Sequence, residues 1–411
     1  MLTANHYQTR LSLDPARRTI DVASTITLEA ISDSGDTLEF YLHRGLAIHT
    51  LTGDGVAGYT VDSQTKAPTT LPHAALLRIT LDAPLRSGRT VTLDTTYGGA
   101  IDDIPAMLPN ALDYGWVELG HVLPWFPYNQ AYGEFTYDLT VECDPAYRVR
   151  GYGTCDQPDG QPCHIACDTP TNDIVVVAAR SLQTFTAERD PFTVHIHHAD
   201  MDEAAVAQMA EDVLNILTNY DDWFGGDAPW QVAVIPTQRD HGGGYGRRGL
   251  VVLGDSVSGS TYLDDRKRLF LHLAHEFAHI WWWRAPADTW EDWLNEGFAE
   301  YSALLAVRAC FGSAAQNALM AQKRDALDDT PPIWGFDRTP GNGDPDHVLL
   351  YEKAPVLLHH LDGLLGHERF LALCRTMIGH RVNSTARFLR LLNSRGHEDA
   401  GRWLEQQLRT R

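Results

Sequence analysis

The 411-residue sequence lacks any uncharged apolar run of about 18 residues, the length that a helix needs to cross a bilayer. Its N-terminal stretch has no basic segment followed by an apolar one, the pattern typical of a secretory leader. Basic residues are scarce, since 33 Lys and Arg stand against 54 Asp and Glu and the net charge is -21. Such a charge disfavours nucleic acid and anionic membrane surfaces, so we expect neither as a partner and expect a cytoplasmic location.

Cysteine is also sparse, with six residues in the chain. Four of them lie close together, at Cys143, Cys155, Cys163 and Cys167, separated by eleven, seven and three residues. These separations do not match the paired C-x2-C pattern of structural zinc sites. In a chain that is not exported, such cysteines are expected to be free thiols.

Residues 1–188 are rich in short runs in which apolar and polar residues alternate. Glycine, proline, aspartate and serine punctuate these runs, as turns between strands require. The clearest runs are at 19–28, 77–81, 90–93, 135–141 and 174–178. Strands of this length and spacing predict an N-terminal antiparallel β-sandwich domain.

The pattern changes after residue 188. Apolar residues at 206, 209, 213, 214 and 217 follow helical spacing and predict a helix over Glu203 to Tyr220. Two short strands are expected at 232–236 and 250–253, with a glycine-rich segment between them, and nearly everything beyond 263 reads as helix. Residues 189–411 are therefore expected to form a second, α/β domain rich in helix.

The motif H-E-x-x-H occurs at His275, Glu276 and His279. On a helix, positions i and i+4 lie on one face one turn apart, so both imidazoles can reach the same metal ion. Glu276 then lies beside the ion without ligating it, where it can take a proton from an attacking water. The spacing predicts a zinc site with Glu276 as the catalytic base.

A bare H-E-x-x-H also arises by coincidence on amphipathic helices, but the context here argues for a site. The residues from 269 to 283 are largely apolar and aromatic, so the helix is expected to be buried, where polar side chains are costly without a purpose. The stretch 293–301 on the next expected helix offers Glu296 as a third ligand. Glu300, one turn later, could accept a hydrogen bond from a ligand imidazole or could simply lie on the surface.

Two segments carry a family resemblance: Ala274-His-Glu-Phe-Ala-His-Ile-Trp281 and Trp293-Leu-Asn-Glu-Gly-Phe-Ala299. With them the chain resembles the aminopeptidase N family of gluzincin zinc metallopeptidases, which also includes leukotriene hydrolase. The resemblance implies a β-sandwich followed by a thermolysin-like catalytic domain, one Zn²⁺ per chain and a peptide substrate. It also implies a short, two-domain member, because the family's large C-terminal helical domain has no counterpart.

A further motif of the family, Y-E-K-G, resembles Tyr351-Glu-Lys-Ala354. The resemblance implies that Tyr351 donates a hydrogen bond to the oxyanion of the tetrahedral intermediate. Alanine at position 354 replaces the family's glycine. Sixteen residues separate His279 from Glu296, two fewer than is usual in the family, and loops absorb such deletions.

The largest departure concerns the family's G-x-M-E-N segment, which binds the substrate backbone and its free amine. It corresponds here to Gly243, Gly244, Tyr245, Gly246 and Arg247, so Gly246 stands where the family has its glutamate. Glu118 lies where the family carries a second amine-binding residue, and it could anchor the amine alone. The resemblance thus implies a substrate-binding set in which one acidic residue is missing.

Three hypotheses follow from these residues. The leading one is a zinc aminopeptidase with atypical amine recognition. The second is an endopeptidase or specialised peptide-processing enzyme, in which residues 242–249 bind an extended peptide and Arg247 with Arg248 meets a carboxylate. The third is an inactive binding scaffold, which the complete set of catalytic residues disfavours. The sequence indicates neither side-chain specificity nor an oligomeric state.

Overall fold

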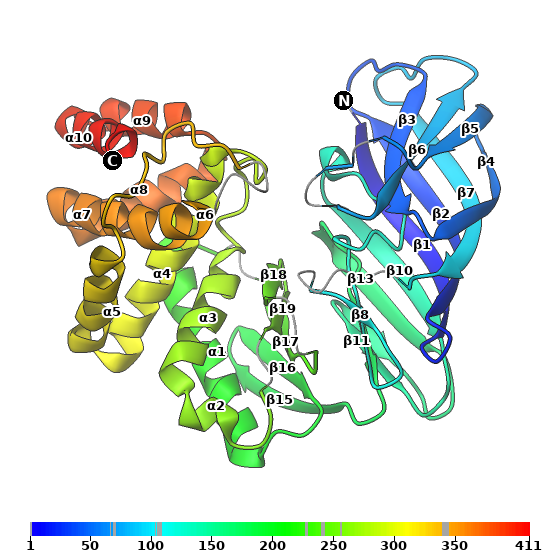
Figure 1. Cartoon of the computed structure of the whole chain (residues 1–411), viewed down its shortest axis with the longest axis horizontal. Helices are drawn as coiled ribbons and strands as arrows, with labels where there is room; N and C mark the ends of the chain where they lie inside the picture. Colours follow the sequence, from blue (N-terminus) through cyan, green and yellow to red (C-terminus); the bar gives the residue numbers. More distant parts are fainter. Residues whose placement is uncertain are drawn as a thin grey trace. The chain divides into compact units, whose positions relative to one another are not determined.

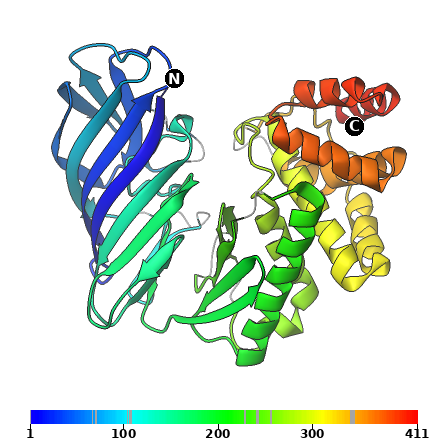
Figure 2. The same cartoon turned by 180° about the vertical axis from the view of Figure 1, so that it is seen from behind.

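The computed structural model describes residues 2–65, 67–68, 71–102, 104, 109–226, 229–239, 243–254, 257–338 and 345–411. The chain divides into two compact units, which are described separately (Figures 1 and 2). The first comprises Met1–Phe185, Ile196–Met201 and Ala233–Ser258, and the second comprises Thr186–His195, Asp202–Val232 and Gly259–Arg411. Because this division follows packing and interleaves segments of the chain, the predicted boundary between residues 188 and 189 stays a prediction.

Three sheets build most of the first unit, as the alternating pattern predicts. The largest has the order β12-β13-β10-β1-β2-β7-β4, with bounds Thr154–Asp156, Cys163–Thr171, Phe135–Glu142, Leu2–Asp14, Thr19–Ala30, Thr90–Ala100 and Leu46–Gly53. The second has the order β11-β14-β9-β8, with bounds Arg148–Gly151, Val176–Ala179, Trp116–Leu119 and Ala111–Leu112. The third has the order β3-β6-β5, with bounds Thr37–His43, Ala74–Leu81 and Val56–Asp62.

Alternation along these strands places apolar side chains in one shared core. In β2, for example, Ile20, Val22, Ile26 and Leu28 are buried, whereas their neighbours at odd positions are partly or fully exposed. The core also contains buried residues of the other sheets and of η1 (Gln130–Tyr132). Burial on alternate positions is what a sheet with one face against a core requires, so the predicted β-rich N-terminal part is confirmed.

One detail of the predicted sandwich is wrong, because β1 and β10 pair in parallel, with His6 opposite Thr136 and Ser12 opposite Glu142. The neighbouring pairs β1–β2 and β10–β13 are antiparallel. Adjacent runs joined by a tight turn must be antiparallel, but β1 and β10 are far apart in the chain and their connection imposes no such direction. Local alternation carries no information about which distant strand becomes a neighbour.

A mixed five-stranded sheet has the order β15-β16-β17-β19-β18, with bounds Gln183–Arg189, Phe192–His198, Gln231–Pro236, Leu250–Leu253 and Tyr245–Arg247. β17 pairs in parallel with β19, and β18 pairs antiparallel with β19 at the end of the order. The strands predicted at 232–236 and 250–253 are thereby confirmed. Of the glycine-rich segment between them, His241 and Gly242 lie outside the described residues.

The second unit is mainly helical, and its first helix, α1, runs over Glu203–Phe224, which confirms the helix predicted from residue 203. Short helical turns are η2 (Trp290–Asp292) and η3 (Val348–Lys353). The remaining helices are α2 (Thr261–Asp264), α3 (Arg266–Ala278), α4 (Trp293–Phe311), α5 (Ser313–Asp325), α6 (Pro345–His347), α7 (Ala354–Leu365), α8 (His367–Gly379), α9 (Thr385–Ser394) and α10 (Glu398–Arg409).

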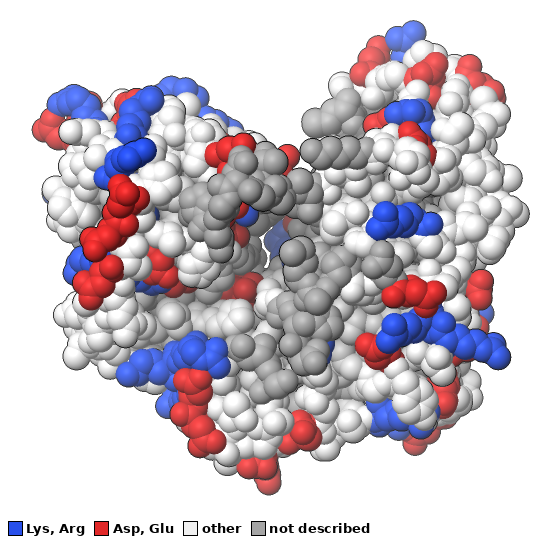
Figure 3. All heavy atoms as spheres, in the orientation of Figure 1, with Lys and Arg blue, Asp and Glu red and all other residues white. Residues whose placement is uncertain are grey.

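Charged side chains of both signs are interspersed on the face shown in Figure 3. Many of the arginines pair with a nearby carboxylate, as Arg78 does with Glu39 at 2.8 Å and Arg409 with Glu405 at 2.9 Å. Within the described part of the chain, no helix has the length and apolar character needed to cross a membrane. All six cysteines are free thiols in the structure.

Candidate metal centre

The helix α3 presents one apolar face to the interior through Leu269, Phe270, Leu273 and Phe277, all at most 1% exposed. His275 and Glu276 lie near its C-terminal end and are also buried. His279 follows the last residue of α3 but keeps right-handed helical angles, φ -64° and ψ -10°. The two histidines therefore still lie one helical turn apart on the same face, although α3 itself ends between them.

The helix α4 carries Glu296 in its first turn. The shortened connection between α3 and α4 is closed by Asn295, whose side-chain amide donates to the Ala285 carbonyl and accepts from the Ala285 N–H, both at 3.0 Å. A Cβ added at Gly297 would lie 2.6 Å from the Ala354 methyl, so α4 and α7 approach closely there. Alanine fits at position 354 because its partner on α4 is glycine.

The three predicted ligand side chains converge in the second unit. His275 Nε2 lies 3.2 Å from a Glu296 carboxylate oxygen and 3.2 Å from His279 Nε2, and His279 Nε2 lies 3.5 Å from the same oxygen. Tetrahedral zinc with bonds of about 2.0–2.1 Å holds its ligands about 3.3–3.5 Å apart. The separations of these three atoms therefore fit a single zinc ion, and the donor set of two imidazoles and a carboxylate suits that metal.

Hydrogen bonds at the outer nitrogens orient both rings. His279 Nδ1 lies 2.8 Å from the Trp282 carbonyl, which can only accept, so Nδ1 carries the proton of that bond. His275 Nδ1 donates in the same way to Glu300 at 2.9 Å. The inner Nε2 atoms of both rings are thus the ones directed at Glu296, which is the tautomer that metal ligation needs.

Glu300 occupies the place beside a ligand imidazole that we anticipated as one of two alternatives. It is 7% exposed, so it is not a surface residue. Burial alone would raise the pKa of its carboxyl, but the hydrogen bond from His275 and the charge of Lys323 outweigh burial and hold that pKa at about 2. Glu300 is therefore an ionised acceptor for the imidazole N–H.

Glu276 lies beside the ligand atoms and is 8% exposed. Burial tends to raise the pKa of its carboxyl, but a hydrogen bond with His272 and the charges of His275 and His279 lower it below its usual range. The His272 ring nitrogen Nε2 is 3.4 Å from Glu276 Oε1. Glu276 is thus held as a carboxylate, the form that can accept a proton.

Tyr351 lies in η3, a short π-helical turn between α6 and α7. Its ring centroid is 5.4 Å from that of His275 and 5.1 Å from that of His347. Burial, followed by the negative charge of Glu296, raises the pKa of its phenol well above the usual value. The phenol therefore keeps its proton and can act as a hydrogen-bond donor.

The proposed amine anchor Glu118 belongs to β9 of the first unit and is fully buried. One of its carboxylate oxygens accepts from Arg239 Nε at 3.0 Å, and the other accepts from Trp116 Nε1 at 3.0 Å and Thr237 Oγ1 at 2.7 Å. Its charge is thus balanced inside the protein, and both oxygens already have donors. The amine-binding role of Glu118 stays a prediction, and these internal partners do not favour it.

The segment corresponding to the family's amine-binding motif also lies in the first unit. Tyr245, Gly246 and Arg247 form β18, in register with Val252, Val251 and Leu250. Arg247 Nε donates to buried Asp173 at 2.7 Å, and its guanidinium lies 4.6 Å from the Tyr245 ring centroid. The role of Arg247 toward a substrate carboxylate likewise stays a prediction, because the structure gives it an internal carboxylate partner.

Gly243 and Gly244 precede this strand, and Arg239 donates to the Gly243 carbonyl at 2.6 Å. A Cβ built at Gly254 would come within 2.4 Å of the Gly244 nitrogen, so the two chain segments pass in close contact. The backbone of residues 243–247 is therefore fixed by neighbours within its own unit.

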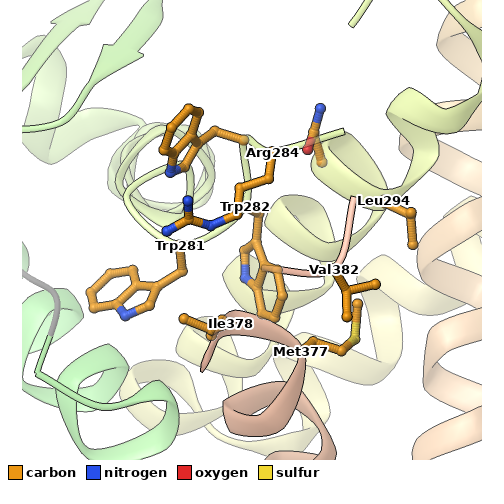
Figure 4. A pocket seen from close by; sticks show the side chains of 9 residues that line it. Trp281, Trp282, Arg284, Leu294, Met377, Ile378 and Val382 are labelled. Carbon is orange, nitrogen blue, oxygen red and sulfur yellow. The ribbon is translucent and has the colours of Figure 1, made fainter. Parts of the chain in front are cut away.

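An aromatic segment after α3 lines a small pocket, and its side chains are drawn in Figure 4. The pocket has room for about one water molecule. The pocket is lined by Trp281, Trp282, Trp283, Arg284, Leu294, Asn295, Met377, Ile378 and Val382.

Several contacts of the centre could not be identified from sequence. The contact of His279 with the Trp282 carbonyl involves the main chain, which every residue type has, so the residue type does not predict it. Lys323 and His347 belong to segments without a recognisable motif. Lys323 stands among the polar residues Gln322, Arg324 and Asp325, so no local pattern marks it as buried, yet it is 7% exposed.

Comparison with known proteins finds a family model that matches part of the chain. Residues 248–400 match the model of the peptidase family M1 domain. Endoplasmic reticulum aminopeptidase 2 from Bos taurus is 30% identical over 107 residues, which is 24% of this chain and 11% of that protein. The Homo sapiens protein of the same name is 31% identical over 107 residues, with the same shares. The chain thus spans about a tenth of the length of these relatives.

Solved structures share the fold over the whole chain. An M1 zinc metallopeptidase from Deinococcus radiodurans has a TM-score of 0.77 and 21% identity, covering 100% of this chain and 94% of that one. A point mutant of that enzyme bound to a Tyr-Ser-Ala substrate has a TM-score of 0.75 and 20% identity, covering 100% and 95%. At these identities the likeness shows the fold, and it confirms the predicted combination of a β-rich N-terminal part with a helical C-terminal part.

Proposed function

We propose that this chain, of which residues 248–400 match the peptidase family M1 domain, hydrolyses peptide bonds with one zinc ion held by His275, His279 and Glu296. The observation that carries the proposal is the geometry of these three side chains. Their ligand atoms all lie within 4.8 Å of one another, at separations that suit one zinc ion. Glu276, a proton acceptor, and Tyr351, a hydrogen-bond donor, border the same atoms.

Each side chain has a separate role in the proposed reaction. Zinc, when bound, supplies a Lewis acid that polarises a carbonyl and makes water acidic enough to lose a proton near pH 7. Glu276 accepts that proton as the water attacks, and then delivers a proton to the leaving amine. Tyr351 donates its phenolic hydrogen to the oxygen on which negative charge develops. Glu300 and the Trp282 carbonyl keep the two imidazoles in place by their hydrogen bonds.

The substrate class we propose is peptides with a free N-terminus, cleaved by an aminopeptidase with atypical amine recognition. Support comes from the curated relatives, which are aminopeptidases by name, although the chain spans only 11% of their length. The recognition would be atypical because position 246 is glycine and because Glu118 is already paired with Arg239. A carboxylate neutralised in this way attracts an ammonium group less than a free one does.

Blocking the amine of one peptide tests this substrate class. We expect a free-amine tripeptide to be cleaved faster than its N-acetylated counterpart, because acetylation removes the charge that the enzyme recognises. With an atypical anchor, the ratio of kcat/KM should be about tenfold to a hundredfold, the value of one lost charged contact. Chromatographic detection of both products with the same enzyme sample gives the ratio. Equal rates for the two peptides would contradict aminopeptidase action.

The second candidate is an endopeptidase or specialised peptide-processing enzyme, and one observation favours it. β18 is the last strand in the order of its sheet, and an extended peptide can add to the backbone of such a strand. Gly246, in the middle of β18, presents no side chain there. Cleavage of blocked peptides at internal bonds, in the acetylation experiment above, would favour this candidate.

Metal content separates both enzymes from an inactive binding scaffold. We expect the purified protein to contain one zinc per chain, because three protein ligands with oriented imidazoles form a complete catalytic set. Elemental analysis after dialysis against zinc-free buffer measures this. A content far below one per chain that added zinc does not restore would instead support the scaffold.

A further inference from the structure

Lys323 lies on α5 and is 7% exposed, which is unusual for a lysine. Its ammonium nitrogen is 2.7 Å from Glu300 Oε1, 2.8 Å from the Tyr351 carbonyl oxygen and 3.3 Å from Glu352 Oε2. An ammonium group has three hydrogens to donate, so each of them has an acceptor. The buried cation is thus fully hydrogen-bonded, and its three acceptors come from two other elements, α4 and η3.

The contact between Lys323 and Glu300 connects Lys323 to the proposed metal ligand His275. Glu300 accepts from Lys323 with one oxygen and from His275 Nδ1 with the other, at 2.7 and 2.9 Å. The carboxylate is therefore held between a cation and the imidazole. If the cation were absent, the buried carboxylate would lose its countercharge and could rotate away from the imidazole, because only one hydrogen bond would restrain it.

The second contact of Lys323 is with the main chain of Tyr351, the candidate hydrogen-bond donor to the oxyanion. In an α-helix the Tyr351 carbonyl would accept from the N–H of residue 355, but residue 355 is proline and has none. The chain around it adopts a π-helical turn, and the Lys323 ammonium donates to this carbonyl. Lys323 thus donates to a carbonyl whose α-helical partner, the N–H of residue 355, is missing, at the residue whose ring lies 5.4 Å from the His275 ring.

We propose that Lys323 is a positioning residue that holds the metal ligand His275, through Glu300, and the main chain of Tyr351 in one fixed relation. The proposal rests on the proposed function, because it concerns the same centre. It differs from a purely structural role in what it predicts. A lysine that only stabilised the packing of α5 would affect folding, whereas this one affects zinc affinity and the contribution of Tyr351 to turnover.

The first experiment is Lys323→Met, which keeps the aliphatic stem and removes the ammonium. We expect the zinc dissociation constant, measured by competition with a chelating dye, to rise by about tenfold or more. With saturating zinc we expect kcat to fall by about tenfold to a hundredfold while KM stays close to the wild-type value. Lys323→Arg, which keeps a buried cation with several donors, should recover part of both losses.

A double-mutant cycle tests the link to Tyr351. Tyr351→Phe should lower kcat much less in the Lys323→Met background than in the wild type, because the phenol is already misplaced there. Additive effects of the two substitutions would contradict the link, and unchanged zinc affinity in Lys323→Met would contradict the link to His275. Should Lys323→Met fail to fold, Lys323→Gln, which keeps two donors without the charge, is judged by the same two measurements.

Lys353→Met is the matched control. Lys353 is 6% exposed and donates to the carbonyls of Pro331 and Thr410, at 2.9 and 2.7 Å, so it is an equally buried lysine without a contact to Glu300 or the Tyr351 carbonyl. The Lys353→Met substitution should lower the melting temperature and leave zinc affinity at the wild-type value. A wild-type chain that binds no zinc would contradict the proposed function itself, which sets that failure apart from a failure of Lys323 alone.

Discussion

Replacing Glu276 by glutamine is expected to lower kcat by about 10³-fold while one zinc per chain remains bound. Glutamine has nearly the same shape as glutamate, but its amide cannot accept the proton of the attacking water. The substitution leaves the proposed metal ligands in place, because Glu276 is not one of the three residues whose ligand atoms converge. Steady-state kinetics on a peptide substrate, together with zinc analysis of the same sample, measures both quantities.

A matched control for this substitution is Glu405→Gln. Glu405 is an exposed residue of α10 that pairs with Arg409 one turn away, and such surface pairs contribute little to stability. It should leave kcat and zinc content at wild-type values. Retention of substantial turnover in Glu276→Gln would refute the assignment of the base, and loss of zinc in that variant would show that Glu276 acts as a ligand instead.

Replacing Tyr351 by phenylalanine is expected to lower kcat by about 10²–10³-fold, with KM close to the wild-type value. The phenol is the group aimed at the developing oxyanion in this proposal, so its hydrogen bond forms fully only in the transition state. The ring remains, and with it the contacts to His275 and His347. Zinc affinity should therefore change little, and the effect should appear in turnover.

Tyr301→Phe is the control for Tyr351→Phe. Tyr301 is buried on α4, and its hydroxyl donates to Asp362 at 2.6 Å. Loss of that hydrogen bond should lower the free energy of unfolding by about 1.5–3 kcal/mol without lowering kcat. If Tyr351→Phe instead behaved like Tyr301→Phe, with reduced stability and full turnover, the role assigned to Tyr351 would be wrong.

The two histidines and Glu296 illustrate what local sequence can predict. Their spacing on α3, and the position of Glu296 on the next helix, required only that both segments be helical and buried, and both conditions hold in the structure. Even the shortened connection leaves Glu296 within 3.2 Å of His275, because Asn295 closes it on Ala285. Periodicity and burial are local properties, so a single sequence is sufficient to predict them.

Glu118 and Arg247 illustrate the opposite case. Both were predicted to bind substrate, Glu118 from its place in the family and Arg247 from the glycine-rich segment, and the structure pairs Glu118 with Arg239 and Arg247 with Asp173. These partners are 121 and 74 residues away in the chain, and no spacing rule connects them. The parallel pairing of β1 with β10 has the same origin, since it depends on which distant strand becomes a neighbour.

The H-E-x-x-H motif, the downstream glutamate and the alternating N-terminal runs were sufficient, without coordinates, to predict a β-rich part, a helical part and the three side chains that converge as a candidate metal site. Tertiary structure alone decided what surrounds that triad: the Trp282 carbonyl on His279, Glu300 on His275, and Lys323 between Glu300 and the Tyr351 backbone. The reason is physical. The periods of helices and strands follow from backbone geometry, so they can be read from neighbouring residues in the sequence. A countercharge needs only to be close in space, so it can come from any distance along the chain.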